Sequence, residues 1–338
     1  MRRRCLYNPH MRTCTLIALL SCALLIPAAA PAADSSLLRL APADSEALIG
    51  INIRQILASD FGKMVMAQMA GPSHPEVKAF SDQAGFDPMR DLEEVLIAAP
   101  AKQNPSALFL MRGKFDVAKL AQLAAMGGMK GADYKGVQVM VRSGQKGGFS
   151  AVAVMDPTLI VGGDEPGVRA FVDRSGTGAG LGEEIAAKAS EASKANDIWM
   201  VVHAAPSAFS PQGANPGAAG KVMESIEQAS LGVKFGSDIV VWVKAVTHTP
   251  EDAAGLVSAL QFFSSMAASQ KSNAQMTAML QRLKIGSEGN TAKISLTIPE
   301  ADAEAAVRDA MASGKKQSKN EPNVGWDVTG GPAAAAKH

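Results

Sequence analysis

Apolar positions recur along the chain with two periods, which predict helices and strands in alternation. Leu57, Phe61, Met64 and Val65 share the spacing of one helical face, so we expect a helix from about residue 54 to residue 70. Apolar runs of strand length occur at EALIGINI, VLIAAP, SALFLMRG, YKGVQVMV, FSAVAVM and TLIVGG, with turn signals such as SGQKGG between them. We expect further helices at about residues 75–84, 115–125 and 165–174.

The order of elements repeats in the second part of the chain. Strands are expected at DIWMVVHAAP, GVKFG, DIVVWVKAVTH, KIGSE and TAKISLTI, and helices over about 222–229, 250–270, 273–283 and 300–312. Each part contains strand, helix, strand, strand and helix, which suggests that one unit was duplicated and diverged. We therefore expect an α+β fold, with two similar sections of largely antiparallel sheet and helices packed on one face.

Shifts in composition divide the chain into five segments. They are a signal peptide (1–32), a first α+β section (33–175), a linker and polar helix (176–196), a second α+β section (197–313) and a disordered tail (314–338). The linker begins with the glycine-rich stretch SGTGAGLGEE, and the tail has no periodic apolar pattern. Whether the two sections share one core is left open by the sequence.

The N-terminal segment has the three-part order of a secretory signal. Arginines precede an apolar run from Thr15 to Ile26, which is shorter than the roughly 20 residues of a membrane-spanning helix, and small residues follow it. Cleavage after Ala32 places small residues at both positions that the peptidase reads. We expect a bacterial periplasmic or secreted protein with no transmembrane helix in the mature chain. Met1 and Met11 both stay open as the start.

Lipid attachment at Cys22 is the alternative for this segment. The stretch Leu19-Leu20-Ser21-Cys22 resembles a bacterial lipobox, although Leu20 stands where a smaller residue is usual. The apolar core also continues beyond the cysteine, whereas a lipobox cysteine normally closes it. In this alternative the protein is a lipoprotein anchored to a membrane through Cys22.

The cysteine content and the charge exclude several classes of function. All three cysteines lie in the first 22 residues, so the mature chain would have no disulfide, no cysteine nucleophile and no thiolate metal site. The leader carries four arginines and no acid, and its removal changes the formal charge from +1 to −3. A mildly acidic chain is not attracted to nucleic acid, so we expect no nucleic-acid partner.

The chain has no catalytic or cofactor motif above background, so we expect no cofactor and no metal site, and an enzyme is not the favoured class. Ser143 and Lys146 have the spacing Ser-x-x-Lys but sit in a hairpin turn, and the five histidines form no close pair. Carboxylates such as Asp164 and Asp252 stand where helices begin, which gives them a capping role. An unrecognised hydrolase built from distant residues stays an alternative.

Two expected strands carry a candidate binding patch. Alternation places Trp199, Val201 and His203 on one face of the first strand, and Trp242 and Lys244 on one face of the second. If the strands are neighbours, the side chains of Trp199, His203, Trp242 and Lys244 could line a small site. Packing of the tryptophans beneath helices accounts for the same pattern.

Two expected helices carry a candidate apolar groove. The first presents Phe262, Phe263 and Met266, and the second presents Met276, Met279 and Leu280. Methionine side chains adapt to irregular apolar ligands, so these residues could border a groove for a lipid or a peptide. Packing between helix and sheet is the alternative explanation.

The stretches LIGINIRQILAS, GFDPMRDLEEVLIAAP and DPTLIVGG together resemble uncharacterised exported bacterial proteins, which are grouped only as domains of unknown function. The resemblance spans most of residues 40–312 and implies export and an α+β fold, but it carries no site or activity. We therefore expect a non-catalytic extracytoplasmic binding or interaction protein, whose partner is an unknown protein or a small apolar ligand.

Overall fold

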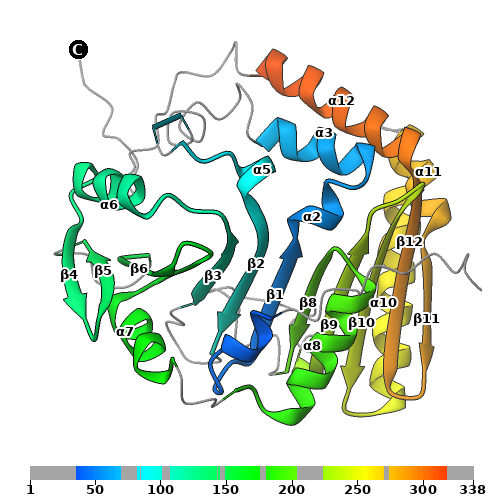
Figure 1. Ribbon diagram of the computed structural model, residues 1–338. Coiled ribbons are helices and arrows are strands. Elements are labelled where there is room, and N and C mark those ends of the chain that lie inside the picture. Colours follow the sequence, from blue (N-terminus) through cyan, green and yellow to red (C-terminus); the bar gives the residue numbers. More distant parts are fainter. Residues whose placement is uncertain are drawn as a thin grey trace, which may run out of the picture.

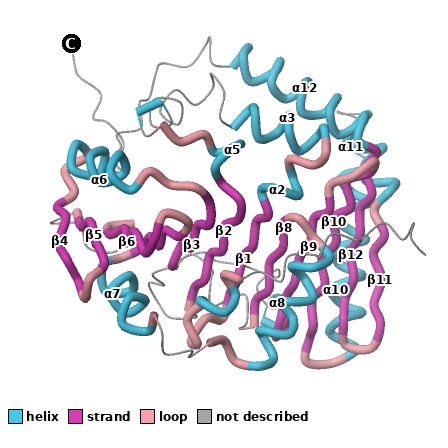
Figure 2. The backbone as a smooth tube through the Cα atoms, in the orientation of Figure 1, coloured by secondary structure: helices cyan, strands magenta, loops and turns pink. Residues whose placement is uncertain are grey.

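Twelve strands form one continuous antiparallel sheet in the described part of the protein (Figure 1). A computed structural model describes residues 36–69, 82–83, 85–100, 107–142, 144, 149–175, 180–203, 224–269 and 274–317. The expected leader and most of the expected tail lie outside these residues, as does most of the helix expected at 75–84. Helices flank the sheet on both sides and at one end (Figure 2), so the fold is α+β, as the sequence predicts.

The first half of the sheet comprises β1 to β7. Its elements are η1 (Leu38–Leu40), β1 (Ala47–Asn52), α2 (Ile53–Ile56), α3 (Asp60–Met69), α5 (Pro88–Asp91), β2 (Leu92–Ala99), β3 (Leu108–Gly113), α6 (Val117–Met126), β4 (Lys130–Tyr134), β5 (Val137–Val141), β6 (Ala151–Asp156), β7 (Leu159–Gly163) and α7 (Glu165–Arg174).

The second half comprises β8 to β12. Its elements are α8 (Glu183–Ala195), β8 (Ile198–Val202), β9 (Ile226–Lys234), β10 (Asp238–Thr247), α10 (Pro250–Ser269), α11 (Ala274–Arg282), β11 (Lys284–Glu288), β12 (Thr291–Pro299) and α12 (Glu300–Gln317). Two boundaries differ from the sequence prediction. Residues 226–229, expected at the end of a helix, belong to strand β9, and α12 continues past residue 313.

The two halves share the order of five strands, and the first half has two further strands, β4 and β5, at its edge. The strand order is β11-β12-β10-β9-β8-β1-β2-β3-β7-β6-β5-β4. In each half three consecutive strands form a meander, a helix follows, and a later strand returns to pair with the third: β7 pairs with β3, and β12 pairs with β10. The halves join where β1 pairs antiparallel with β8. This matched order agrees with the duplication that the sequence suggests.

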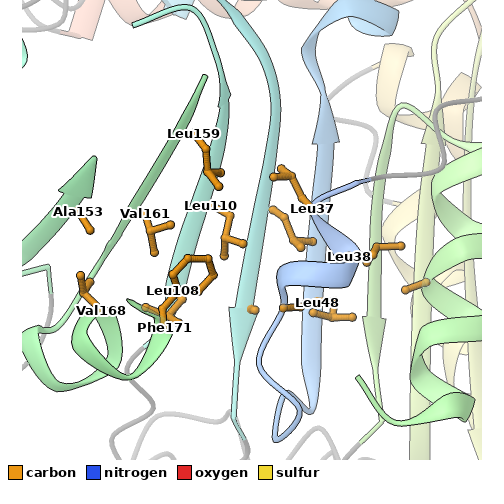
Figure 3. Close-up of a cluster of buried hydrophobic side chains, with 14 of the residues drawn as sticks. Leu37, Leu38, Leu48, Leu108, Leu110, Ala153, Leu159, Val161, Val168 and Phe171 are labelled. Carbon is orange, nitrogen blue, oxygen red and sulfur yellow. The ribbon is translucent and has the colours of Figure 1, made fainter. Parts of the chain in front are cut away.

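The main core lies on the face of the sheet that α7 and α8 cover, which we call the α8 face. Leu96, Leu110 and Val161 lie side by side there because they are direct partners on β2, β3 and β7. Phe171 of α7 packs beneath these strands (Figure 3), and Ala189 of α8 belongs to the same buried cluster. Neighbouring strands from both halves thus contribute to this core, and Trp199 and Val201 of β8 are part of it.

The opposite face, which we call the α10 face, is covered by α6, α10, α12 and α3. Leu256 and Val257 of α10 pack against Ala245 and Ala292 of the sheet. The sequence predicted helices on one face, and the structure places them on both. The physical reason is that the central strands are apolar at successive positions, as in VLIAAP, so both faces require cover. Within the described residues, the helices lack the combination of length and apolar content needed to cross a membrane.

An apolar pocket beneath helix α6

A pocket of about 660 Å³ lies between α6 and the α10 face of the first half of the sheet. Strands β3, β5, β6 and β7 form its floor, and α6 with the segment before α5 forms its walls. The residues that line it are Gln83, Phe86, Met111, Phe115, Leu120, Leu123, Ala124, Met126, Gly127, Met129, Met140, Arg142, Phe149, Val152, Val154 and Ile160. Its lining is thus almost entirely aliphatic, aromatic or thioether, which is typical of sites for apolar molecules.

The local sequence fixes α6 at both ends. The side chain of Asp116 accepts a hydrogen bond from the backbone N–H of Lys119 at 3.1 Å and caps the first turn. Gly127 and Gly128 end the helix, and Gly128 has φ +79°, which suits glycine. Between these ends the helix has ten residues, and none of them is buried. Leu120, Leu123 and Ala124 are only partly buried, and they line the pocket.

The second half of the sheet provides an internal comparison. Helix α10 follows β10 as α6 follows β3, and both helices lie on the same face. In α10, Ala253, Leu256 and Val257 are buried, and Leu256 and Val257 pack on the strands below. At the matching position the first half has a helix with no buried residue and a pocket. The topology by itself therefore does not require this pocket.

Aromatic rings support the wall of the pocket nearest to α5. The rings of Phe86 and Phe115 stack with their centroids 5.6 Å apart. Phe86 stands just before α5, where Asp91 is 7% exposed and accepts hydrogen bonds from the Asp87 backbone N–H at 2.8 Å and from Arg90 Nε at 2.7 Å. The buried carboxylate thus fixes the turn that follows Phe86.

We expect the substitution Asp91→Asn to destabilise the protein in a pH-dependent way. Hydrogen bonds from the Arg90 guanidinium, together with the one from the Asp87 backbone, hold the pKa of Asp91 below its ordinary value, although burial acts in the opposite direction. The carboxylate therefore stabilises the fold above about pH 4, the ordinary value, and this contribution is lost as the pH falls through the lower folded-state pKa.

At about pH 7 the free energy of unfolding of Asp91→Asn should be about 1.5–3 kcal/mol below that of the wild type, the usual contribution of a hydrogen bond to a charged group. Urea unfolding at about pH 7 and about pH 3 measures the difference, which should narrow at the lower pH. An equal loss at both pH values would mean that the charge of Asp91 contributes nothing.

The mouth of the pocket exposes large apolar side chains. Met126 is 71% exposed and Phe149 is 47% exposed. The ring of Phe149 lies directly over Gly162 of β7, where an added Cβ would sit 2.3 Å from the ring, and it contacts Phe109 edge to face at 5.8 Å. Exposed methionine and phenylalanine beside an apolar recess are a feature of binding surfaces.

Arg142 is the one charged residue among the described residues that line the pocket. It follows β5 directly, and its backbone N–H donates to the Ser150 carbonyl at 2.8 Å, which continues the pairing of β5 with β6. Its Nη2 lies 3.5 Å from the Gly127 carbonyl at the end of α6. In the described part of the chain no carboxylate lies within ion-pair distance of Arg142.

The structure places three of the four residues of the patch predicted from the sequence on one face of the sheet, but it buries one of them. Trp199, Trp242 and Lys244 lie on one face, because Trp199 and Trp242 are both partners of Gly232. Trp199 is only 2% exposed and belongs to the core beneath α8. His203 lies past the end of β8, with Nε2 3.6 Å from Glu184 Oε2.

Trp242 and Lys244 do meet, in a recess of about 330 Å³ beside α8. Trp242 Nε1 donates to Asn196 Oδ1 at 2.8 Å, and Lys244 Nζ lies 4.9 Å from the centroid of the Trp242 ring. The indole is thereby held in place by the protein's own groups. Binding at this patch stays a prediction.

The groove predicted between α10 and α11 has a different geometry from the one expected. Phe262, Phe263 and Met266 are 65%, 55% and 47% exposed, so they are not core residues. Met279 lines a separate recess of about 470 Å³ between α11 and α12. The side chain of Met276 lies outside the described residues.

Asp164 caps α7 as the sequence predicts, whereas at α10 the cap is Thr249, and the Asp252 carboxylate accepts a hydrogen bond from the Thr249 hydroxyl at 2.8 Å. Asp164 Oδ1 accepts from the Gly167 backbone at 2.9 Å, and the Thr249 hydroxyl accepts from the Asp252 backbone at 3.1 Å. Ser143 and Lys146 lie outside the described residues. Within the described ranges, His, Cys, Asp and Glu side chains form no group of three or more with the geometry to hold a metal ion.

The sequence did not predict the pocket because the residues that line it come from segments far apart along the chain. The stretch LAQLAAMGGM combines apolar residues at helical spacing with two methionines, and Met140 and Phe149 follow after a hairpin. An apolar helix with so little bulk on its inner face is a signal for loose packing. Only the fold shows that these segments face one another.

Comparison with known proteins adds little to this geometry. No protein-family model and no curated protein matches the chain. Among solved structures, one titled "Structure of crystal form III of TP0453" is similar to this chain, with a TM-score of 0.46 and 10% sequence identity. The match covers 81% of this chain and 97% of that chain, and it has no bearing on function.

Proposed function

We propose that this protein binds an apolar ligand, without catalysis, in the pocket beneath α6. The observation that carries the proposal is an apolar pocket of about 660 Å³ below a helix with no buried residue. This volume lies within the range of roughly 300–1,000 Å³ that small-molecule sites occupy.

An apolar ligand in this pocket would complete the packing that the chain leaves open. Leu120, Leu123 and Ala124 of α6 face Met140 and Ile160 of the sheet across the pocket. Burial of apolar surface contributes about 25 cal/mol per Å², so a ligand that covers both walls gains several kcal/mol for each few hundred Å² removed from water. Polar ligands find few partners here, because Gln83 and Arg142 supply the polar side chains of the lining.

We infer in addition that the protein acts outside the bacterial cytoplasm. This part of the proposal rests on the secretory order of residues 1–32 and on the resemblance to exported proteins. A non-catalytic extracytoplasmic binding protein is the function expected from the sequence, and the pocket favours an apolar molecule as its partner.

A second candidate is an interaction surface on α10. Phe262 and Phe263 contact each other edge to face at 5.8 Å, and both are more than half exposed together with Met266 nearby. A cluster of large apolar side chains on a surface is typical of protein–protein contact. This surface lies on α10 over the second half of the sheet, whereas the pocket lies over the first half, so variants at one need not disturb the other.

Titration with the neutral fluorophore Nile red tests the proposed function. We expect the emission to rise and to saturate at one dye per chain, because the dye enters an apolar enclosure. Dodecanol, a neutral single-chain competitor, should displace it. Absence of saturable binding, or binding that dodecanol leaves unchanged, would contradict a ligand pocket in this protein.

A further inference from the structure

We propose that the ligand of the α6 pocket is a single-chain amphiphile with one negative charge, and that Arg142 binds its carboxylate. The proposal rests on the proposed function and adds the chemical class of the ligand. Three properties of the pocket lead to it: its volume, the charge at its mouth, and the direction from which a chain can enter.

The volume favours one alkyl chain over two. A water molecule takes up about 30 Å³ of the liquid, and a methylene group is of similar size, so about 660 Å³ has room for about twenty such groups. That suits a single acyl chain of ordinary length. The two chains of a phospholipid together exceed this room.

The charge favours an anionic head group. A guanidinium has five N–H donors in a planar fork that matches a carboxylate. In Arg142 the contact within the described residues is the one at 3.5 Å to the Gly127 carbonyl, at the long limit for a hydrogen bond. No other described residue accepts a hydrogen bond from the Arg142 guanidinium, so we take its remaining donors as the ones that a ligand would use. A carboxylate that accepts two of them forms a bidentate pair, the strong form of this interaction.

The placement of Arg142 fits an entering chain. Alternation along β5 puts Arg142 on the same face as Met140, which lies buried at the floor of the pocket. Arg142 itself is exposed and stands beside the end of α6, close to the exposed Met126. A carboxylate held by Arg142 would stay near water while its chain runs inward between α6 and β6.

A simpler role for Arg142 would be to neutralise the carbonyl end of α6. A cation near the last turn of a helix interacts favourably with the helix dipole. That role predicts an effect of Arg142 on stability but no discrimination between charged and neutral ligands. Binding measurements with matched ligands therefore separate the two roles.

The test measures the displacement of Nile red from the full chain by dodecanoate, by dodecanol and by dodecyltrimethylammonium. These probes share one chain and differ in charge. The variants are Arg142→Gln, which keeps the length and removes the charge, and Lys130→Gln as control. Lys130 lies opposite Val141 on the neighbouring strand, so its side chain is on the other face of the sheet.

We expect wild-type protein to bind dodecanoate more tightly than dodecanol and the cationic probe most weakly. Arg142→Gln should lower the affinity for dodecanoate about tenfold, which corresponds to about 1.4 kcal/mol, and leave the affinity for dodecanol unchanged. Lys130→Gln should change neither. Higher salt should lower the affinity for dodecanoate but not for dodecanol, since salt screens an exposed ion pair.

Two results would overturn the proposal in different ways. Equal affinity for dodecanoate and dodecanol in both wild type and Arg142→Gln would contradict an anionic ligand, while the proposal of an apolar binding pocket would stand. Failure of every probe to displace the dye would also remove the proposed function. Monoanionic phosphatidylglycerol in a further titration distinguishes the source of the charge: stronger binding than dodecanoate would contradict a single-chain ligand.

Discussion

Replacement of Ala124 by tryptophan should abolish ligand binding beneath α6 while the fold persists. Ala124 lies on α6 and lines the pocket, so an indole at this position points into the space where a ligand would lie. It would displace at least about four chain carbons, and each buried methylene contributes about 0.8 kcal/mol. The affinity for dodecanol should therefore fall by about a hundredfold or more.

The neighbouring residue provides a matched control. Ala125 is on the same helix, but it is exposed and does not line the pocket. Ala125→Trp introduces the same side chain on the same element and should leave binding within about twofold of the wild type. Both variants should unfold in urea no earlier than the wild type. Unchanged dodecanol binding in Ala124→Trp would show that the pocket is not the ligand site.

Substitution of Gly50 by alanine should strongly destabilise the protein. Gly50 lies in β1 directly opposite Trp199 of β8, at the junction of the two halves of the sheet. A Cβ at Gly50 would stand 2.2 Å from Trp199 Cε2, and the indole is 2% exposed and cannot move aside into solvent. Overpacking typically costs about 1–3 kcal/mol, and displacement of a large buried side chain costs more.

We therefore expect Gly50→Ala to lower the free energy of unfolding by about 3 kcal/mol or more, measured by urea denaturation. Gly286→Ala is the control, because Gly286 also lies within a strand but nothing stands within 4 Å of its added Cβ. The double variant Gly50→Ala with Trp199→Leu should lose less than the sum of its single losses, since the clash is with the indole. Equal stability of Gly50→Ala and Gly286→Ala would contradict the close packing of Gly50 against Trp199 at this junction.

The sequence predicted the helices and strands whose apolar residues recur with the period of their buried face. Helix α10 and strand β12 were expected at nearly the observed bounds. In α10 the buried positions Ala253, Leu256 and Val257 have helical spacing, and in β12 the apolar residues alternate along the strand. Strand β4 was missed, since Lys130–Tyr134 is a mostly exposed edge strand without an alternating apolar pattern. Strand β9 was partly predicted as helix, and its state is decided by pairing with β8 and β10.

The union of the halves into one sheet depends on the pairing of Ala47 with Val202, more than 150 positions apart. No pattern within a short stretch of sequence predicts a contact between such distant residues. The candidate site was hidden for a related reason. A pocket is the volume that facing side chains leave unfilled, and neither α6 nor β5 carries that information alone. The sequence singled out phenylalanines and methionines on the helices over 250–270 and 273–283 as a candidate groove, and Phe262 and Phe263 are exposed there. The pocket beneath α6 was not predicted.

The measurement that tests the central claim most directly is photo-crosslinking with a dodecanoate that carries a diazirine at the end of its chain. The labelled protein would be digested and the modified residues located by mass spectrometry, with unlabelled dodecanoate as competitor. The pocket predicts competed labels on residues that line it, above all Leu123, Met140 and Val154. Competed labels confined to α10 and α11 would contradict the account and assign ligand binding to the exposed Phe262 and Phe263 instead.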